Sequence, residues 1–239
     1  MSIQAKTYKA LLKLNRFKSI QNITQKINKI TYKVKFEQWY HDMLHSDLYS
    51  LTDSSKPNIY KHRYKLYNYI VDSYSLKDTP ITYIEFGVYK GESMKWWVDN
   101  NLNPESTFFG FDTFEGLPEK WGNRLAGTFS TNGNTPEIRD KRVEFVVGMF
   151  QDTLPGFFTK NTVKQRTLLH LDADLYSSTL FVLSNCNNIL KKGDILLFDE
   201  FTDVKHEFRA FTDFASAFNF KYKPIASVNR GEQIAFEVI

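Results

Sequence analysis

Residues 81–93 read Ile81-Thr82-Tyr83-Ile84-Glu85-Phe86-Gly87-Val88-Tyr89-Lys90-Gly91-Glu92-Ser93. An apolar, β-branched run ends in an acid and a glycine, and a second glycine and a serine precede a segment of helical character. This pattern predicts a strand that turns sharply into a helix. The backbone N–H groups of such a turn and the positive end of the helix dipole bind an anionic or zwitterionic ligand.

From Pro80 onward, predicted strands alternate with predicted helices. We expect strands at 81–86, 107–111, 143–147, 167–171 and 194–198. We expect helices at 93–100, near Leu154, at 177–190 and at 205–218. Alternation of this kind indicates a parallel sheet with helices on both faces.

The C-terminal end departs from this alternation. Residues 220–228 and 232–239 both have strand character, and only Asn229-Arg230-Gly231 separates them, which predicts an antiparallel hairpin. Pro224 predicts that the first of these strands is bent or lies partly at an edge. A mostly parallel α/β sheet closed by a C-terminal antiparallel hairpin is typical of the Rossmann-like class I S-adenosylmethionine (SAM) methyltransferases rather than of dehydrogenases.

The first 36 residues, the basic arm, differ in charge from the rest of the chain. Nine basic residues and no acidic residue precede Glu37, and the remainder carries 22 basic and 27 acidic residues, a net charge of −5. We therefore expect residues 1–76 to form a helical cap or oligomerisation segment, rich in aromatic residues from 37 to 76, and residues 77–239 to form the cofactor-binding domain.

Apolar side chains in the basic arm recur at helical spacing, at Phe17, Ile20, Ile23, Ile27, Ile30 and Val34. One interpretation is a helix packed on the body or on a second subunit, as in a homodimer. The other is a basic amphipathic helix that contacts an anionic membrane surface peripherally.

Composition excludes several classes of protein. The sequence has no run of about 18 apolar residues, so no membrane span is expected. Lysines interrupt the apolar residues near the N-terminus, so the apolar core of a signal peptide is absent there. The single cysteine, Cys186, excludes an internal disulfide and fits a reducing compartment, so a cytoplasmic location is expected. The body lacks the basic surface of a nucleic-acid-binding protein.

The cofactor turn favours a small amino-acid-bearing nucleoside over a dinucleotide. Gly87 and Gly91 do not form GxGxxG. Glu85 is expected near the ammonium group of the cofactor, and Ser93 is expected to cap the helix and contact the carboxylate. Asp112 ends the second strand, where an acid commonly accepts hydrogen bonds from the ribose hydroxyls of SAM or NAD.

The segment after the third expected strand reads Gly148-Met149-Phe150-Gln151-Asp152-Thr153-Leu154-Pro155. An adenine ring would lie here in such a sheet. Met149 or Phe150 could contact the ring, and Asp152 could accept from the exocyclic amine or cap a helix.

Four acids follow the next two strands. Asp172 and Asp174 end one strand, and Asp199 and Glu200 end the next, so neighbouring parallel strands would bring them to one rim of the sheet. Close carboxylates repel unless they are protonated or bind a cation such as Mg²⁺. The cation could lower the pKa of a substrate hydroxyl while a spare carboxylate takes its proton. Alternatively, these residues are solvated strand ends and helix caps.

These blocks together resemble the class I SAM-dependent O-methyltransferases of the TylF/MycF/NovP type, the macrocin O-methyltransferase family, over roughly residues 81–211. The blocks that carry the resemblance are Glu85-Phe86-Gly87-Val88-Tyr89-Lys90-Gly91-Glu92-Ser93, Phe111-Asp112-Thr113-Phe114-Glu115-Gly116-Leu117-Pro118, Phe150-Gln151-Asp152-Thr153-Leu154-Pro155, Leu171-Asp172-Ala173-Asp174-Leu175-Tyr176 and Phe198-Asp199-Glu200-Phe201.

The resemblance implies an enzyme (EC 2.1.1.-) that transfers a methyl group from SAM to a sugar hydroxyl with help from Mg²⁺. It implies that Asp172, Asp199 and Glu200 bind the metal, and that Asp174 accepts the proton, with Asp172 also at the catalytic centre. The implied cofactor-binding residues are Glu85, Gly87, Tyr89, Gly91, Ser93, Asp112, Thr113, Phe150, Asp152 and Asp172.

One residue departs from the family pattern, because Glu200 stands where the family has a second aspartate. A metal-independent SAM methyltransferase therefore stays open as an alternative, as do an NAD-type oxidoreductase and a non-catalytic binding module. The long polar loop 119–142 has two interpretations: a lid, with Trp121 and Phe129 available to stack on an acceptor, or a mobile surface loop without a role.

Overall fold

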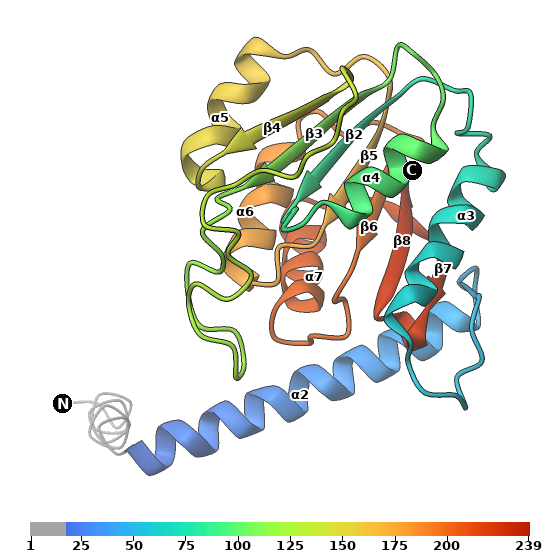
Figure 1. Cartoon of the computed structure of the whole chain (residues 1–239). Coiled ribbons are helices and arrows are strands. Elements are labelled where there is room, and N and C mark those ends of the chain that lie inside the picture. Colours follow the sequence, from blue (N-terminus) through green and yellow to red (C-terminus); the bar gives the residue numbers. More distant parts are fainter. Residues whose placement is uncertain (1–17) are drawn as a thin grey trace.

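The structure, a computed structural model, describes residues 18–239, with side chains from residue 21 onward. Its centre is an eight-stranded sheet in the order β1-β7-β8-β6-β5-β2-β3-β4 (Figure 1). The predicted apolar positions Phe17 and Ile20 lie outside the described side chains.

The strands are β1 (Tyr49–Ser50), β2 (Ile81–Phe86), β3 (Thr107–Asp112), β4 (Val143–Val147), β5 (Arg166–Leu171), β6 (Ile195–Phe198), β7 (Tyr222–Val228) and β8 (Gln233–Val238). The α-helices are α2 (Lys18–Leu44), α3 (Arg63–Ser73), α4 (Glu92–Asn100), α5 (Phe150–Lys160), α6 (Tyr176–Cys186) and α7 (Glu207–Ala217), and the 3₁₀ helices are η1 (Tyr60–His62) and η2 (Asn229–Gly231).

Strands β2 to β6 pair in parallel, and β8 pairs antiparallel with both β6 and β7. The predicted parallel sheet with a C-terminal antiparallel hairpin is therefore confirmed. The register shifts between Pro224 and Ala226, so the proline bends β7 as expected.

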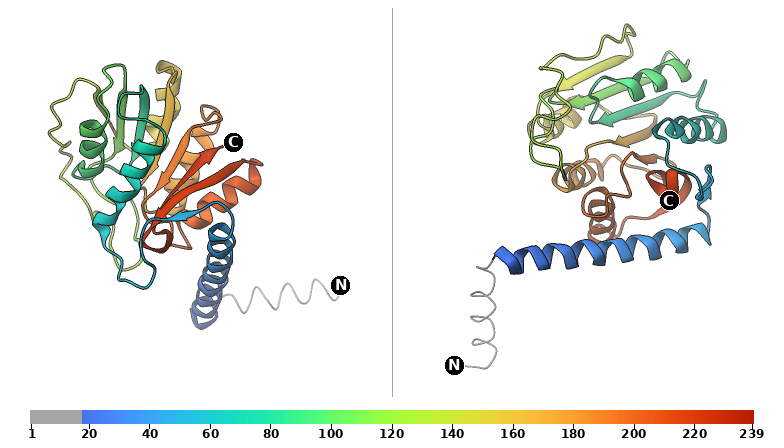
Figure 2. Two further views of the ribbon diagram at one scale, coloured as in Figure 1. Left: turned by 90° about the vertical axis from the view of Figure 1, so that its right-hand side faces the viewer. Right: turned by 60° about the horizontal axis from the view of Figure 1, so that its bottom comes forward.

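Strand β2 is buried along its whole length because it is covered on both faces. Ile84 and Phe86 pack into the core that includes α5, α6 and α7, whereas Ile81 and Tyr83 pack into the core that includes α3 and α4. This alternation follows the period of two of a strand. Figure 2 shows the two helical layers on opposite sides of the sheet.

The sheet has a topological switch point between β2 and β5. The chain runs outward from β2 to β3 and β4, and then returns to the other side of β2 to form β5. Ligands of open α/β sheets bind outside the carboxyl ends of the strands at such a point. The cofactor turn after β2 and the Asp172 acid pair after β5 both lie there.

Helix α2 packs against the body through its C-terminal half. Phe36 is buried against Phe201 and Phe208, and Tyr40 lies within hydrogen-bond distance of Ser227 through its hydroxyl, at 3.2 Å. The N-terminal half extends along the underside of the body (Figure 1). There the predicted stripe is 56–64% exposed; it consists of Ile23, Ile27, Ile30 and Val34.

The prediction that residues 37–76 are helical is wrong for the segment between α2 and η1. Tyr49 and Ser50 instead add a short parallel strand beside β7. Asp53 accepts a hydrogen bond from the Ser55 N–H at 2.9 Å, an Asx turn that competes with helix formation. The helix expected to reach residue 190 ends at Cys186, whose side chain is buried in the core as predicted.

None of the helices among the described residues combines the length and the apolar composition that crossing a bilayer requires.

Candidate functional site

The turn after β2 approaches the end of β5 so closely that only glycine fits. Gly87 has φ +91°, and a Cβ built on it would lie 1.8 Å from the carbonyl oxygen of Asp172. Gly91 has φ +74°, and its Cβ would lie 2.8 Å from the Pro136 ring. Both glycines are therefore required by conformation and by space.

Asp112, at the end of β3, holds this turn in place. Its Oδ2 accepts hydrogen bonds from the N–H groups of Val88 and Tyr89, both at 2.8 Å, and its Oδ1 accepts from the Phe114 N–H at 2.8 Å. Because a carboxylate oxygen has two acceptor positions, Oδ1 retains one for a ligand hydroxyl.

The prediction that Ser93 caps the following helix is wrong. Helix α4 begins at Glu92, and Gly91 is its N-cap residue. Ser93 lies inside the first turn, buried, with its hydroxyl 3.4 Å from the hydroxyl of Tyr67. The left-handed conformation of Gly91 starts the helix one residue earlier than the hydroxyl suggested.

Glu85 is a buried carboxyl group at the base of the turn. Its Oε1 lies 3.6 Å from Nδ1 of His170, and its Oε2 has no hydrogen-bond partner among the described residues. Burial raises the pKa of Glu85 well above its usual value, and burial lowers the pKa of His170 to about 3. His170 is thus neutral, which leaves Glu85 without a cationic partner on this side. A buried, unpaired carboxyl oxygen suits a ligand ammonium group.

The smaller of two described cavities, of about 150 Å³, lies beside this turn. The predicted cofactor residues that line it are Gly87, Tyr89, Asp112, Thr113, Phe150 and Asp172. Met149 and Gln151 line it as well, whereas Asp152 is exposed and does not. Phe150 and Asp152 are two positions apart on α5, so they point in nearly opposite directions around the helix.

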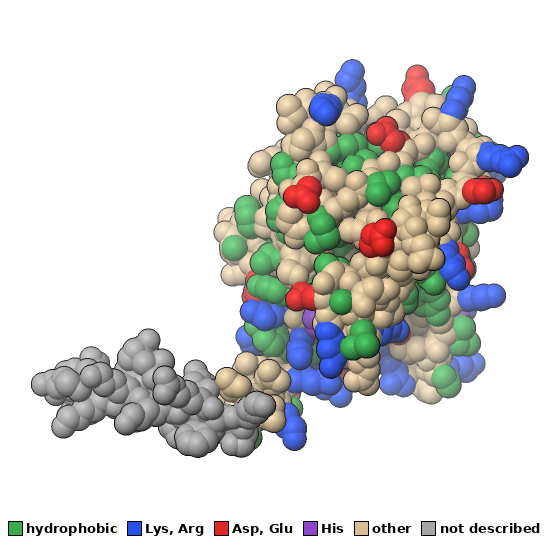
Figure 3. All heavy atoms as spheres, turned by 60° about the vertical axis from the view of Figure 1, so that its left-hand side comes forward, with side chains coloured by type: hydrophobic (Ala, Val, Ile, Leu, Met, Phe, Trp, Pro, Cys, Tyr) green, Lys and Arg blue, Asp and Glu red, His purple; other side chains and the backbone are tan. Residues whose placement is uncertain are grey.

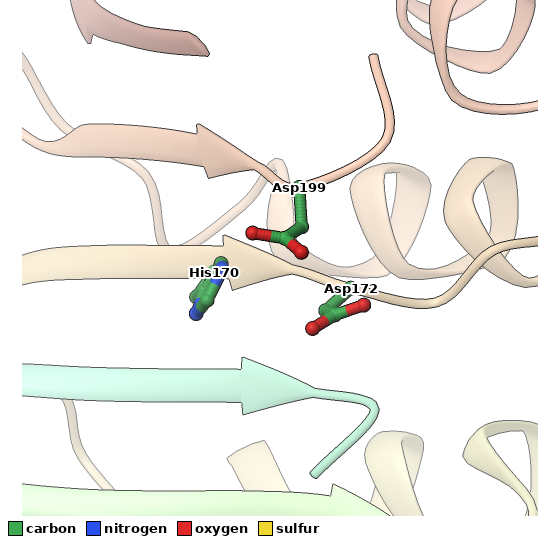
Figure 4. A group of neighbouring side chains, drawn as sticks. All are labelled: His170, Asp172 and Asp199. Atoms are coloured by element: carbon green, nitrogen blue, oxygen red, sulfur yellow. The ribbon is translucent and has the colours of Figure 1, made fainter. Parts of the chain in front are cut away.

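The acids after β5 and β6 gather at one rim of the sheet, as predicted. Carboxylate oxygens of Asp172, Asp174 and Glu200 lie within 4.8 Å of one another, and so do ligand atoms of His170, Asp172 and Asp199. Figure 4 shows the second group, with His170 on β5, Asp172 just after β5 and Asp199 just after β6. The three predicted metal ligands are therefore divided between two groups that share Asp172.

The backbone conformation at Asp174 differs from the extended one that was predicted. The extended conformation does not persist beyond Asp172, because Asp174 has φ +57°. Burial raises its pKa to about 7, partly offset by the nearby positive charge of Arg124. Asp174 can therefore exchange a proton near neutral pH.

The remaining acids are more deeply buried. Burial raises the pKa of Asp199 to about 6, and burial together with neighbouring acids raises the pKa values of Asp172 and Glu200 well above the usual range. Both oxygens of Asp199 and Oε2 of Glu200 are buried without a hydrogen-bond partner among residues 18–239. Unsatisfied, buried carboxylate oxygens fit a hard divalent cation.

Arg63 is a functional candidate that the sequence analysis missed. It lies at the start of α3, is buried, and places Nη1 3.6 Å from Oδ2 of Asp199. Its guanidinium also stacks on the ring of Tyr60, at 4.0 Å from the centroid, and donates to the Tyr60 hydroxyl. An arginine amid four tyrosines of the segment 60–69 gives no local signal of its distant partner.

Glu207, in the first turn of α7, is a second residue that was missed. Its Oε2 accepts a hydrogen bond from the Glu200 N–H at 3.0 Å, and its Oε1 is buried without a partner in the described part of the chain. Burial, and next the charge of Asp172, raise its pKa well above the usual value. Glu207 therefore positions Glu200 and adds another acid behind the rim.

A larger cleft, of about 1090 Å³, adjoins the smaller cavity. The two share the lining residues Tyr60, Tyr89, Phe129, Asp172 and Glu200. Loop residue Trp121 also lines the cleft, and its Nε1 donates to Asp203 at 2.8 Å. The predicted aromatic pair Trp121 and Phe129 thus lies at the cleft, and the acid rim lies where the two spaces meet.

One protein-family model matches part of the chain. The family model described as Macrocin-O-methyltransferase (TylF) matches residues 128–231, which include the acids Asp172, Asp174, Asp199 and Glu200. This segment is similar to the TylF family. The predicted resemblance is therefore confirmed over the half of the sheet that carries the acid rim.

A curated relative is also named as an O-methyltransferase. It is the 8-demethyl-8-(2,3-dimethoxy-alpha-L-rhamnosyl)-tetracenomycin-C 4'-O-methyltransferase of Streptomyces olivaceus, 26% identical over 167 residues, or 59% of this chain. The matched region spans 62% of that relative.

Solved structures agree on the fold. The calicheamicin methyltransferase CalS11 superposes with a TM-score of 0.58 at 20% identity, over 85% of this chain and 91% of that one. The O-methyltransferase NovP superposes with a TM-score of 0.54 at 20% identity, over 73% of this chain and 79% of that one. The chain thus has the Rossmann-like methyltransferase fold that the TylF-family resemblance implies.

Proposed function

We propose that this protein is a SAM-dependent O-methyltransferase that acts on a hydroxyl group of a sugar or of a glycosylated small molecule. One observation carries the proposal: a cavity at the cofactor turn and a larger cleft meet at Asp172 and Glu200. A methyl donor in the first space and an acceptor in the second would come together at the acid rim.

The names of similar proteins support the same activity. The matched family is described as macrocin O-methyltransferases, and the Streptomyces relative is named for 4'-O-methylation of a dimethoxyrhamnosyl group. Both names state an O-methyl transfer, and the second places it on a rhamnosyl group, so a sugar hydroxyl is the acceptor group that we propose.

The cofactor roles follow from the geometry of the turn. Glu85 would bind the ammonium group of SAM through its unpaired Oε2, and the free acceptor position of Asp112 would bind a ribose hydroxyl. Phe150, beside Met149 in the smaller cavity, would contact the adenine ring. These residues approach from three strand ends, as the switch point requires.

The acid rim would position and deprotonate the acceptor. SAM would supply an electrophilic methyl group, and a divalent cation held by Asp172, Asp199 and Glu200 would polarise the acceptor hydroxyl. Asp174 lines the smaller cavity and has a pKa of about 7, so it can take the proton of the hydroxyl as the carbon–oxygen bond forms. Glu207 holds Glu200 in place through the Glu200 N–H.

A second candidate is a SAM methyltransferase that needs no metal. The observation that favours it is Arg63, whose guanidinium already places a positive charge 3.6 Å from Asp199. In that case the positive charge of Arg63 balances the negative charge of the acids, and Glu200 contributes only to the shape of the pocket.

The decisive experiment combines binding with turnover. We expect calorimetry to detect binding of S-adenosylhomocysteine, and thermal stabilisation by this ligand but not by NAD. Methyl transfer from labelled SAM to a panel of glycosides should require Mg²⁺ and fall at least 100-fold in Asp174→Asn. Full turnover in EDTA would select the metal-independent candidate, and stabilisation by NAD alone would favour an oxidoreductase. Absence of any SAM-type binding would leave a non-catalytic module.

The predicted contacts of the basic arm stay predictions. The exposed stripe that begins at Ile23 is available to an anionic membrane surface or to a second subunit. Co-sedimentation with anionic liposomes and light scattering of the protein in solution would test the two interpretations separately.

A further inference from the structure

The larger cleft has an uneven distribution of charge that the proposed reaction does not use. Its acids lie at the floor, where Glu85, Asp172 and Glu200 line it. Basic side chains from four segments also line it: Lys29 and Lys33 of α2, Lys90 of the cofactor turn, Arg124 of the loop, and Arg230 of η2. Figure 3 shows Lys and Arg side chains gathered low on the molecule, at the level where α2 lies in Figure 1.

None of these five side chains forms an ion pair among the described residues, although the charge of Arg124 acts on Asp174. The chain preceding α2 cannot neutralise them, because no acidic residue occurs before Glu37. Arg124 is held by the Trp121 ring, with its guanidinium carbon 4.4 Å from the centroid.

The remaining acids that line the cleft have other partners. Glu92 pairs with Arg63 at 3.5 Å, Asp203 accepts from the indole of Trp121, and Glu232 accepts from the Asn58 amide at 2.7 Å. Glu37 also lines the cleft, one helical turn after Lys33. Among these acids only Glu92 has a cationic partner, because a neutral indole or amide donor does not neutralise a carboxylate.

The two α2 lysines face the cleft because of their position on the helix. Lys29, Lys33, Phe36 and Tyr40 are three or four residues apart, so they share one face, and all four line the cleft. Phe36 and Tyr40 anchor this face to the body. Helix α2 therefore contributes Lys29 and Lys33 to the lining of the cleft, while its apolar stripe lies on another face.

We propose that the acceptor is an anionic sugar: a glycosyl phosphate or diphosphate whose phosphate group binds the basic side chains of Lys29, Lys33, Lys90 and Arg124. The inference rests on the proposed function and names its substrate class. The basic side chains attract the phosphate, and a phosphate bound there would leave a sugar hydroxyl free to reach Asp174. The cleft volume of about 1090 Å³ has room for a sugar and its phosphate substituent, at the upper end of the range for ligand sites.

The phosphate group has two plausible sources, a soluble nucleotide and a lipid carrier. Glucose 1-phosphate, UDP-glucose and a polyprenyl diphosphate-linked glucose in detergent micelles are the three probes, with methyl α-glucoside as the uncharged control. Affinity is measured by calorimetry on the full chain saturated with S-adenosylhomocysteine. At least one phosphate ester should bind about tenfold or more tightly than methyl α-glucoside, and the tightest of the three identifies the source.

Two variants distinguish binding at the proposed phosphate site from a general effect of lost positive charge. Lys29→Gln combined with Lys33→Gln should weaken binding of the preferred phosphate ester about tenfold while leaving S-adenosylhomocysteine affinity unchanged. Lys35→Gln is the matched control, because Lys35 is exposed on the same helix and does not line the cleft. It should bind the ester like the unaltered protein.

Two outcomes would overturn the inference while S-adenosylhomocysteine still binds: equal affinity for the charged probes and methyl α-glucoside, or equal effects of the double variant and Lys35→Gln. Failure of S-adenosylhomocysteine to bind at all would instead refute the proposed function itself.

Discussion

Replacement of Gly87 by alanine should test the architecture of the cofactor turn directly. The new Cβ would lie 1.8 Å from the carbonyl oxygen of Asp172 and 2.8 Å from its carbonyl carbon. The segments that contain Gly87 and Asp172 cannot separate freely. The Asp172 N–H donates to the Phe86 carbonyl oxygen at 2.9 Å, and the Gly87 N–H donates to the Phe111 carbonyl oxygen at 3.0 Å. Gly87→Ala must therefore strain the ends of β2 and β5 together.

The magnitude follows from two contributions. Holding alanine at φ +91° costs about 1–2 kcal/mol, and relieving the clash in a packed site costs about 1–3 kcal/mol. The free energy of unfolding should thus fall by about 2–5 kcal/mol. Gly127→Ala is the matched control, since Gly127 has φ +82° but a Cβ there would meet nothing within 4 Å. That variant should lose only about 1–2 kcal/mol.

Urea unfolding followed by tryptophan fluorescence measures both variants, and calorimetry with S-adenosylhomocysteine measures the site. Gly87→Ala should also bind this ligand more weakly, whereas Gly127→Ala should not. If the two variants lost the same stability, the close approach of the turn to Asp172 would be refuted.

Three further predictions concern the acids. Asp112→Ala should weaken S-adenosylhomocysteine binding by about 1–3 kcal/mol, because it frees the Val88 and Tyr89 N–H groups as well as removing an acceptor; calorimetric affinity equal to that of the unaltered protein would contradict this. Glu207→Ala should destabilise the protein by about 1–3 kcal/mol by leaving the Glu200 N–H unpaired, whereas Glu207→Gln, which keeps an acceptor and resembles the protonated acid, should cost less than about 1 kcal/mol in urea unfolding. Equal losses in the two Glu207 variants would argue against that hydrogen bond. In EDTA the melting temperature should fall as pH rises from 5 to 8. The folded-state pKa values of Asp174 and Asp199 are about 7 and about 6, whereas the unfolded value is 3.8. The folded state therefore holds more protons than the unfolded state, and it loses stability as these protons dissociate. Asp174→Asn should flatten this slope, and a melting temperature that rises over the same pH range would show that these acids are not protonated in the fold.

The elements of the sheet could be predicted because their signals are local. Strand β2 is a short β-branched run between turn residues, and the hairpin of β7 and β8 is marked by Gly231. The acid rim could also be predicted, since parallel neighbours end at the same edge, and Asp172 and Asp199 each follow a buried strand.

The rest depends on contacts that no local pattern reveals. Arg63 meets Asp199 only after α3 packs against the sheet, and Glu207 faces the rim because of the rotation of α7. Asp152 was predicted in the cavity because it is next in sequence to cavity residues, but helical geometry turns it outward. The exposure of Ile23 and its stripe also depends on where α2 docks.

The two-residue strand β1 has a practical consequence for shortened forms of the protein. Tyr49 and Ser50 pair with Ala226 and Ser227, and the chain between β1 and α3 delivers Tyr60 and Arg63 to the acid rim. Expression from residue 77 onward would uncover the outer hydrogen-bonding groups of β7 and remove the one buried cation that faces Asp199. Such a fragment would be prone to edge-to-edge aggregation, and its behaviour would say little about the intact protein.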